Sequence, residues 1–553
     1  MDYQDFWQGK YPDCIARNID TNIYPTLLDL FKDACRKYAN KPAFSNMGRT
    51  LTFAELDKYS ATFATWLQQN TELHIGDRIA IQLPNVLQYP IAVFGALRAG
   101  LVVVNTNPLY TAREMEHQFK DAGCKALLTL ANFAHLVQEV LPRTGIRYVM
   151  ISEIADMMPL PKRLMMNSVV KYLKRKVPAY NLPDAIPFTQ MMSANPNKLQ
   201  EASPKPEDIA VLQYTGGTTG IAKGAMLTHK SITSNMVQTH AFLATVLETG
   251  RETMVCPLPL YHIFAFGVSC IGMIMGMHTL LITNPRDIKG FIQELKTWPF
   301  TAIMGLNTLF VALMNHPEFK KLDFSRLKLT IAGGMAMQQQ VALDWEKLTN
   351  CPVCEGYGMT ESSPVISLNP PNAIQIGTIG LPTPNTEVRI VNEEGQDMPI
   401  GEAGELWARG PQLMKGYWQR AQATAETMTV DGWLKTGDIA MIQPDGYIKI
   451  VDRKKDMILV SGFNVYPNEI EEIAAAHAGV LESAAVGMPD QKSGEVVKLF
   501  VVKKDPELTE ESLMIHLKTG LTAYKLPRSI VFKDELPKSP VGKILRRELR
   551  DKV

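Results

Sequence analysis

The sequence predicts an α/β fold: a large N-terminal domain of β-sheets flanked by helices, a small β-barrel-like subdomain, and a small C-terminal α+β lid domain. Three observations predict it. Short β-rich runs alternate with amphipathic stretches through most of the chain. Two alternating runs joined by Gly-rich turns follow at residues 387–410. A compact module of mixed helix and strand patterns ends the chain, so we expect domains at 1–451 and 452–553.

The first domain is predicted from a strand–helix–strand unit. Residues 78–84 form a short apolar strand, residues 89–100 an apolar helix that ends at its glycine, and residues 101–107 a second buried strand. A helical crossover between consecutive strands is typical of a parallel sheet. In the C-terminal module, residues 468–477 and 509–521 have helical patterns, with Thr509 as an N-cap, and residues 495–504 read as a strand.

Composition and charge exclude several classes of protein. Hydrophobic residues make up 46% and charged residues 20% of the 553, which is typical of a globular chain. The formal net charge of +1 gives no global field for nucleic acid. Seven cysteines, an odd and sparse set, suit a reducing compartment, and the N-terminus lacks the basic start and apolar core of a signal peptide. We expect a cytoplasmic protein with no nucleic-acid partner.

One apolar stretch, residues 263–282, has about the length of a membrane span. It carries Ser269, His278 and Thr279 and lacks basic residues on one flank. We therefore interpret it as a buried helix beneath an active site.

The clearest chemical motif is YTGGTTGIAKGAMLTH, residues 214–229, which follows a short apolar run and so lies at a strand end. Its glycines free backbone N–H groups to converge on an anion, its threonines add hydroxyl donors, and Lys223 adds a positive charge. No Gly-Lys-Ser/Thr sequence closes it as a Walker A loop requires. The motif predicts a polyphosphate cradle, the alternative being an ordinary turn.

A second motif, EGYGMTE, spans residues 355–361. Tyr357 stands between two glycines and offers an exposed aromatic face on which adenine can stack. Glu361 offers a carboxylate to Mg²⁺, a cation that prefers oxygen ligands and phosphates. The motif indicates a nucleotide-binding edge.

Three further residues and one charged segment give weaker signals when each is considered alone. His262 lies in the apolar run LPLYHIFAF, where a histidine is commonly part of a core. Asp438 follows Gly437, where it either holds a turn or accepts hydrogen bonds from ribose hydroxyls. Lys543 follows a loop that contains Pro and Gly and precedes a basic helix, and such a basic tail is usually solvated surface. The charged residues 452–456 lie between two β-like runs and indicate either a solvated hairpin turn or a hinge.

Taken in this order, the five motifs resemble the adenylate-forming superfamily of acyl-CoA synthetases, nonribosomal peptide adenylation domains and luciferases. The resemblance covers essentially the whole chain, and its specificity comes from the combination of motifs. Residues 431–473 resemble the fatty-acyl-CoA synthetase signature, and the whole sequence is similar to bacterial long-chain fatty acid CoA ligases.

The resemblance implies where ATP and Mg²⁺ bind. The implied set is Thr215, Gly216, Gly217, Thr218, Thr219, Gly220 and Lys223 at the phosphates; Gly333, Gly334 and Tyr357 around adenine, with Gly356, Gly358 and Thr360 as further nucleotide-binding residues; Asp438 and Arg453 at the ribose; and Thr215 and Glu361 near Mg²⁺.

The resemblance also implies residues that act on the acyl group and CoA. The implied set is Lys543, His262 and Glu361 as catalytic residues; Gly462 on the pantetheine path; Asp452 as the hinge; and Phe264 and Phe266 in an acyl tunnel, Phe266 standing at a gating position where relatives carry Trp.

These residues together predict a long-chain fatty acid CoA ligase that works in two steps. Fatty acid and ATP give acyl-AMP and pyrophosphate, and acyl-AMP and CoA then give acyl-CoA and AMP, with a rotation of the lid domain between the steps. The alternatives are a medium-chain or aryl-CoA ligase and, in another class, a non-catalytic nucleotide-binding regulator docked on a membrane.

A basic amphipathic segment indicates where such a protein meets a membrane. Residues 157–180, which begin with Met157 and end with Tyr180, contain six Lys or Arg residues, no acid, and apolar residues between them. This pattern predicts peripheral contact with the anionic inner face of the cytoplasmic membrane, the alternative being a solvated helix packed on the body. The oligomeric state is left open, with a homodimer as one candidate.

Overall fold

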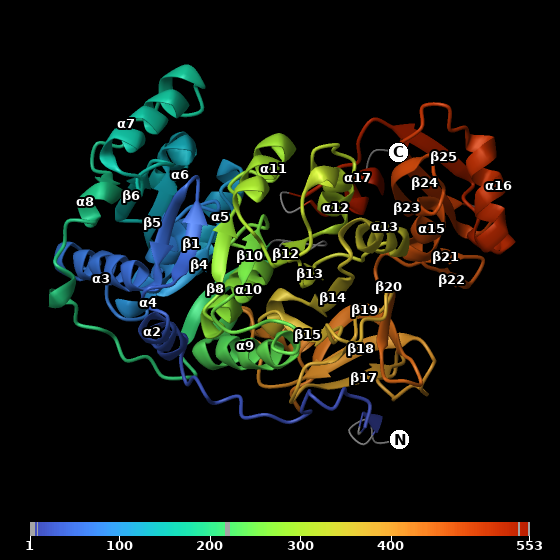
Figure 1. Cartoon of the computed structure of the whole chain (residues 1–553). Helices are drawn as coiled ribbons and strands as arrows, with labels where there is room; N and C mark the ends of the chain where they lie inside the picture. Colours follow the sequence, from blue (N-terminus) through green and yellow to red (C-terminus); the bar gives the residue numbers. More distant parts are fainter. Residues whose placement is uncertain (1–5, 8, 216–221, 491, 540–541, 551–553) are drawn as a thin grey trace.

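The computed structural model describes residues 6–7, 9–215, 222–490, 492–539 and 542–550. Within these residues the chain forms four sheets (Figure 1). Two large sheets and one smaller sheet are built by residues up to 453, and a fourth sheet is built by the C-terminal part alone. The predicted α/β architecture with a separate C-terminal α+β module is thereby confirmed.

The seven-stranded sheet contains the predicted strand–helix–strand unit. Its order is β7-β6-β5-β3-β4-β8-β9, and its strands are β3 (Arg78–Gln82), β4 (Val102–Asn105), β5 (Cys124–Leu130), β6 (Tyr148–Ser152), β7 (Ile186–Pro187), β8 (Ile209–Thr215) and β9 (Lys223–Thr228). β3 and β4 are parallel and are joined by helix α4 (Gln88–Arg98), as predicted. Every residue of α4 is buried, which explains its apolar pattern on all sides.

The nine-stranded sheet has a parallel centre and antiparallel edges. Its order is β16-β15-β14-β13-β12-β10-β11-β1-β2, and its strands are β1 (Pro42–Asn46), β2 (Arg49–Thr52), β10 (Thr253–Cys256), β11 (His278–Leu281), β12 (Ala302–Gly305), β13 (Leu329–Ala332), β14 (Val353–Gly358), β15 (Val365–Leu368) and β16 (Leu381–Pro382). Its centre is formed by the neighbouring strands β14, β13, β12, β10, β11 and β1, which pair in parallel.

Helices flank both sheets, as the amphipathic stretches predict. They are α2 (Leu27–Lys37), α3 (Phe53–Asn70), α5 (Ala112–Ala122), α6 (Ala134–Val140), α7 (Leu160–Ser168), α8 (Phe188–Met191), α9 (His229–Leu243), α10 (Ile263–Ile274), α11 (Ile288–Thr297), α12 (Asn307–Met314), α13 (Gln339–Thr349) and α14 (Ala421–Thr427). Four of them, α2, α3, α5 and α9, begin at a threonine that forms a capping box with the third helical residue.

The apolar stretch 263–282 is a buried helix only in its first part. α10 ends at Ile274, Gly276 adopts a φ of +59°, and the remaining residues form strand β11. A glycine at positive φ ends the helix because other residues are strained in that conformation. No helix among the described residues is long and apolar enough to cross a membrane.

The smaller sheet is antiparallel, as the alternating runs predict. Its hydrogen-bonded order is β17-β18-β19-β20, formed by β17 (Glu387–Val391), β18 (Gly404–Arg409), β19 (Leu434–Ile442) and β20 (Ile448–Arg453). The fourth sheet has the order β22-β21-β24-β23 with β25 beside β24, formed by β21 (Ile458–Val460), β22 (Phe463–Val465), β23 (Val480–Asp490), β24 (Gly494–Lys503) and β25 (Ser529–Lys533).

The C-terminal sheet carries helices α15 (Pro467–Ala475), α16 (Glu510–Gly520) and α17 (Arg546–Arg550). Thr509 forms the predicted N-cap of α16 through a capping box with Ser512. These elements have hydrophobic clusters of their own, separate from those of the large sheets. Figure 1 shows them gathered at one end of the molecule, beside α12 and α13.

The charged segment 452–456 does not form a hairpin. β20 pairs with β19, whereas β21 pairs with β22 and β24, so the two strands belong to different sheets. The hairpin interpretation is therefore wrong. The segment is the connection between the four-stranded sheet and the C-terminal sheet.

Candidate active site

The candidate site lies at the carboxyl ends of strands from both large sheets. β8 leads into the Gly/Thr-rich loop, β13 leads into Gly333 and Gly334, and β14 contains residues 355–358. The Gln213 side chain at the end of β8 donates to the Tyr261 carbonyl, 2.9 Å away, which brings the region of His262 to the same place. Open α/β sheets bind their ligands at such edges, so residues distant in sequence converge here.

The two stems of the phosphate motif, β8 and β9, pair as antiparallel strands and are called the phosphate hairpin below. Thr215 at the end of β8 pairs with Lys223 at the start of β9. The predicted residues Gly216, Gly217, Thr218, Thr219 and Gly220 lie outside the described residues. The two stems therefore bring the Thr215 hydroxyl and the Lys223 ammonium group to neighbouring positions.

Glu361 lies next to this hairpin. It belongs, with Thr360, to a short 3-10 helix (Thr360–Ser362) that follows β14, and its side chain is buried. Burial raises the pKa of Glu361, while a hydrogen bond from the Tyr417 hydroxyl and the charge of Lys223 lower it. A cation beside this carboxylate would favour its ionised form.

Tyr417 is a site residue that the sequence motifs did not indicate. Its hydroxyl donates to Glu361 Oε1 at 2.6 Å, and Lys223 Nζ lies 5.3 Å from the centre of its ring. The backbone around it is bound on both sides, because Met414 N donates to the Glu361 carbonyl and Trp418 N donates to the Gly224 carbonyl, each at 2.8 Å. Tyr417 thus connects the carboxylate to the phosphate hairpin.

Asp438 is held by Tyr357 and Arg453. The Tyr357 hydroxyl donates to Asp438 Oδ2 at 2.6 Å, and Arg453 Nε lies 3.6 Å from Asp438 Oδ1. Asp438 and Arg453 are register partners on β19 and β20, so neither lies in a simple turn. Tyr357 is half-buried rather than exposed, and burial raises the pKa of its hydroxyl well above the ordinary value.

Two of the predicted glycines are packed so closely that a side chain would meet neighbouring atoms. A Cβ at Gly333 would lie 3.1 Å from the Gly356 carbonyl and 3.4 Å from the Phe264 ring, and one at Gly358 would overlap the Pro364 carbonyl. Gly334 adopts a φ of +81°. The close approach of β13 and β14 thus depends on glycine, and Phe264 lies beside this glycine edge.

Lys543 comes from the C-terminal part and reaches the same site. Burial lowers the pKa of Lys543 to about 7, with Arg453 lowering it further and Asp438 acting in the opposite direction. Burial also lowers the pKa of His262 to about 4, and the charge of Lys543 adds to that effect. Lys543 is half-buried, and its role in the site stays a prediction. The Thr308 hydroxyl contacts the Gly542 carbonyl at 3.3 Å and fixes the turn that carries Lys543.

His262 and Asp452 have structural contacts of their own. His262 is the N-cap of α10, and its Nδ1 accepts from Phe264 N at 3.3 Å. Asp452 is fully buried within β20 and accepts from Asn468 N at 2.8 Å, while Arg546 NH1 lies 3.3 Å from Asp452 Oδ1. Burial raises the pKa of Asp452 to about 6. Asp452 is thus held in place within β20, which ends at Arg453, and its role as the hinge stays a prediction.

Gly462 stands apart from this group. It lies in the turn between β21 and β22 with a φ of +85°, and nothing among the described residues lies within 4 Å of the position a Cβ would take. Its place on the pantetheine path stays a prediction.

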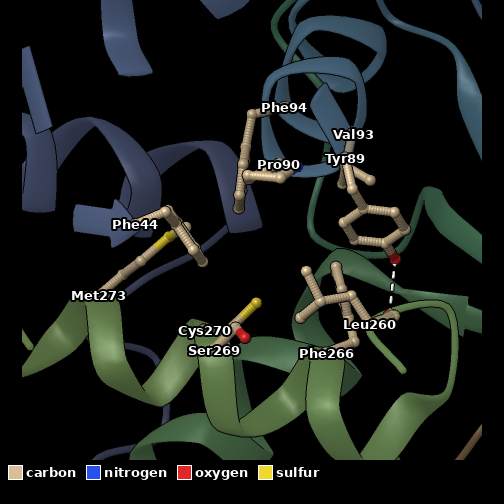
Figure 2. A pocket seen from close by; sticks show the side chains of 10 residues that line it. All are labelled: Phe44, Tyr89, Pro90, Val93, Phe94, Leu260, Phe266, Ser269, Cys270 and Met273. Atoms are coloured by element: carbon tan, nitrogen blue, oxygen red, sulfur yellow. Dashed lines mark hydrogen bonds between the residues drawn. The ribbon is translucent and has the colours of Figure 1, made fainter. Parts of the chain in front are cut away.

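An apolar cavity begins one helical turn from His262. One face of α10 lines it with Phe266, Ser269, Cys270 and Met273, and α4 and Phe44 close it on the other side (Figure 2). Its volume is about 10 Å³, close to the smallest space that holds one water molecule. An alkyl chain can enter only if these side chains move. Phe266 therefore lines the cavity, whereas Phe264 does not.

The residues near the phosphate hairpin fit Mg²⁺ by the chemistry of their donors. Glu361 supplies a carboxylate and Thr215 a hydroxyl, both hard oxygen ligands, in a site that also holds Lys223 for anions. Among the residues that the structure describes, no group of three or more His, Cys, Asp or Glu side chains is arranged to hold a metal ion.

The fold and the site together define the adenylate-forming class of enzymes. Profiles for the AMP-binding enzyme family and for the AMP-binding enzyme C-terminal domain match residues 31–418 and 469–543. The chain belongs to the AMP-binding enzyme family.

Individual relatives agree with this assignment. The chain is 53% identical to a long-chain-fatty-acid–CoA ligase of Yersinia pestis over 99% of this chain and 97% of the relative. It is 33% identical to a feruloyl-CoA synthase of Amycolatopsis sp over 91% of this chain and 94% of the relative. The crystal structure of the anthranilate CoA ligase AuaEII in complex with anthranoyl-AMP has the same fold, with a TM-score of 0.86 at 23% identity over 97% and 99% of the two chains.

Proposed function

We propose that this chain is an ATP-dependent, AMP-forming long-chain fatty acid CoA ligase. The observation that carries the proposal is that the charge of Lys543, from the C-terminal part, acts on His262 and interacts with Asp438, both from the first 451 residues. A cation there can contact a carboxylate and a nucleotide phosphate at once. Identity of 53% to a long-chain-fatty-acid–CoA ligase supports the substrate class.

In the first step, a fatty-acid carboxylate oxygen attacks the α-phosphate of ATP and expels pyrophosphate. Two anions must approach each other, and negative charge grows on the phosphate oxygens. Lys543 would bridge the carboxylate and the α-phosphate, and Lys223 would stabilise the leaving pyrophosphate. Asp438 and Arg453 would hold the ribose, and Gly333, Gly334 and Tyr357 would frame the adenine. Mg²⁺, entering with ATP near Thr215 and Glu361, would neutralise phosphate charge.

In the second step, the CoA thiol attacks the acyl carbonyl of acyl-AMP and AMP leaves. A Lys543 that bridges the carboxylate and the α-phosphate would occupy the approach to that carbonyl, so it would have to withdraw. We place the domain boundary at residue 452 and propose that the C-terminal domain rotates there, with Asp452 as the buried anchor beside the turning residues. Such a rotation opens a path for pantetheine past Gly462 and His262.

The rival substrate classes are weaker on specific grounds. An aryl-CoA ligase is represented by the feruloyl-CoA synthase, with 33% identity against 53% for the long-chain relative. A medium-chain ligase shares the same chemistry and differs only in the length of the acyl cavity. A regulator without turnover would bind the nucleotide but release no AMP, so the product assay separates it from the ligase.

The chemical test is release of AMP and pyrophosphate with MgATP, CoA and fatty acids of six to eighteen carbons. We expect both products and acyl-CoA, with the highest kcat/KM for the long chains. Release of ADP, or product formation independent of any acid, would overturn the proposed reaction. A maximum at short chains or with feruloate would move the enzyme to a rival substrate class.

We also propose that the enzyme is cytoplasmic and docks peripherally on an anionic membrane. α7 continues as a π-helix (Val169–Leu173), so the helix is shorter than the segment 157–180. Leu164, Met165 and Leu173 are 59%, 60% and 78% exposed, and Figure 1 shows α7 at the edge of the molecule. Exposed apolar side chains among lysines suit the interface of an anionic bilayer.

Sedimentation with vesicles tests the membrane proposal. The wild type should sediment with phosphatidylglycerol-rich vesicles at low salt and less with phosphatidylcholine vesicles. Leu173→Glu should lose this binding, while Ile515→Glu, which replaces a residue 61% exposed on α16, should keep it. Equal sedimentation of both variants, or none for the wild type, would overturn the membrane proposal without touching the chemistry.

A further inference from the structure

One hydroxyl group in the wall of the apolar cavity has no partner. Ser269 is 6% exposed, lines the cavity, and its Oγ has no hydrogen-bond partner among the described residues. The other hydroxyl at the cavity, on Tyr89, donates to Asn105 and lies 2.7 Å from the Leu260 carbonyl. A buried hydroxyl without a partner is unfavourable, so a partner supplied by a ligand would be recognised.

The position of Ser269 on α10 puts this residue on the helix face that lines the cavity. Phe266, Ser269, Cys270 and Met273 follow the spacing of one helical face, and Figure 2 shows that face turned toward α4 across the cavity. Helices often satisfy a serine through the carbonyl one turn earlier, but no such bond is present here. The hydroxyl therefore remains free to meet whatever fills the cavity.

The distance along the helix fixes which part of the chain Ser269 meets. Seven residues separate it from His262 in the sequence, which corresponds to about 10 Å along the helix axis. An extended chain advances about 1.2 Å per bond, as a polypeptide does over three bonds per residue. With the carboxylate near His262 and Lys543, Ser269 lies at the level of the middle carbons of an eighteen-carbon acid.

We propose that Ser269 is a specificity residue that recognises an oxygen substituent in the middle of the acyl chain, so that the enzyme accepts mid-chain hydroxy fatty acids in preference to the same acids without the hydroxyl. The inference rests on the proposed function, because it takes the cavity as the acyl site. It adds a second substrate class to the unsubstituted long-chain acids.

The physical basis of the preference is a hydrogen bond between the hydroxyl of the substrate and the Ser269 hydroxyl in the apolar wall of the cavity. A hydroxyl on the acyl chain loses its water on entry, and Ser269 Oγ replaces that water as donor or acceptor. In Ser269→Ala, the substrate hydroxyl would be buried without a partner. A site built around a polar group discriminates more strongly than one built on shape alone.

A competition experiment tests the proposal on the whole enzyme. Octadecanoic acid is mixed with its 10-hydroxy or its 2-hydroxy derivative, and the ratio of the two acyl-CoA products is measured with MgATP and CoA. We expect the 10-hydroxy to unsubstituted ratio to be about tenfold higher in the wild type than in Ser269→Ala. The ratio for the 2-hydroxy acid should be the same in both enzymes.

Two further variants separate recognition from packing. Ser234→Ala removes another fully buried hydroxyl without a partner, on α9 and away from the cavity, and should leave every ratio unchanged. Ser269→Cys keeps the volume with a weaker donor and should give an intermediate ratio. Equal 10-hydroxy ratios in the wild type and Ser269→Ala overturn the inference. Failure of octadecanoic acid itself to give acyl-CoA overturns the proposed function instead.

Discussion

Two corners of the site are held in opposite ways. Around Glu361, Lys223 comes from the phosphate hairpin of the seven-stranded sheet, and residues 414–418, which include Tyr417, come from the connection between β18 and α14 of the four-stranded sheet. These residues contact one another closely. Around Lys543, the described residues of the C-terminal part are bonded to α12 and α13 by Thr308 to the Gly542 carbonyl and by Gln339 N to Glu472 Oε1. Asn468 and Arg546 also contact Asp452 at the end of β20. From this comparison we expect the residues around Glu361, the phosphate corner, to keep their arrangement through both half-reactions, and the residues around Lys543, the Lys543 corner, to move away between them.

Lys543→Ala should have the largest effect and should separate the two corners most clearly. Loss of one electrostatic stabiliser predicts a fall on the order of 10²–10³ in the rate of acyl-AMP formation. Thioester formation from supplied acyl-AMP and CoA should change little. Both rates are measured in separate half-reactions, and an equal fall in both would mean that Lys543 does not belong to a removable corner.

The pH profile sharpens the same point. Burial holds the pKa of Lys543 near 7, so its protonated form prevails below that pH and falls about tenfold per pH unit above it. Adenylation kcat/KM should therefore decline on the alkaline side from about pH 7. In Lys543→Arg the alkaline decline should disappear from whatever activity remains, because arginine stays protonated. An unchanged alkaline limb in that variant would assign the limb to another group.

Tyr417→Phe tests the phosphate corner and should have a moderate effect on adenylation. The variant keeps the ring beside Lys223 and removes only the hydrogen bond to Glu361, a bond to a charged group, so we expect about a tenfold fall in kcat/KM for MgATP. Adenylation alone should fall. Tyr447→Phe, which removes a hydroxyl bonded to the Ala373 carbonyl, is the matched control. Equal losses in the two variants would reduce Tyr417 to a packing residue.

Glu472→Ala should have the smallest effect, and it should slow only the adenylation step, in which the Lys543 corner takes part. α13 has no side-chain cap of its own, and Glu472 from the C-terminal part accepts from its first residue, Gln339, at 2.9 Å. Losing such a cap predicts about a threefold fall in adenylation. Thioester formation should be equal or slightly faster. A threefold fall in both half-reactions would show that this contact does not depend on the position of the C-terminal part.

The sequence was sufficient where the chemistry is local. The stems of the phosphate hairpin, Tyr357 and Glu361 lie within short motifs, and the alternation of strands and helices predicted both large sheets. Tyr417 and Arg546 were missed because their partners, Glu361 and Asp452, are 56 and 94 residues away in sequence. The hairpin interpretation of 452–456 was wrong for the same reason, since each strand found its partner in a different sheet.

The small volume of the apolar cavity has a consequence for the measured affinity of the protein for an acyl chain. Under the proposal that this cavity is the acyl site, only molecules in which Met273 and its neighbours have moved aside can accept a chain, so the measured Kd should exceed the intrinsic Kd by the inverse of that open fraction. Any change that enlarges the open population, such as a shorter side chain at position 273, tightens apparent binding without adding a single contact to the ligand.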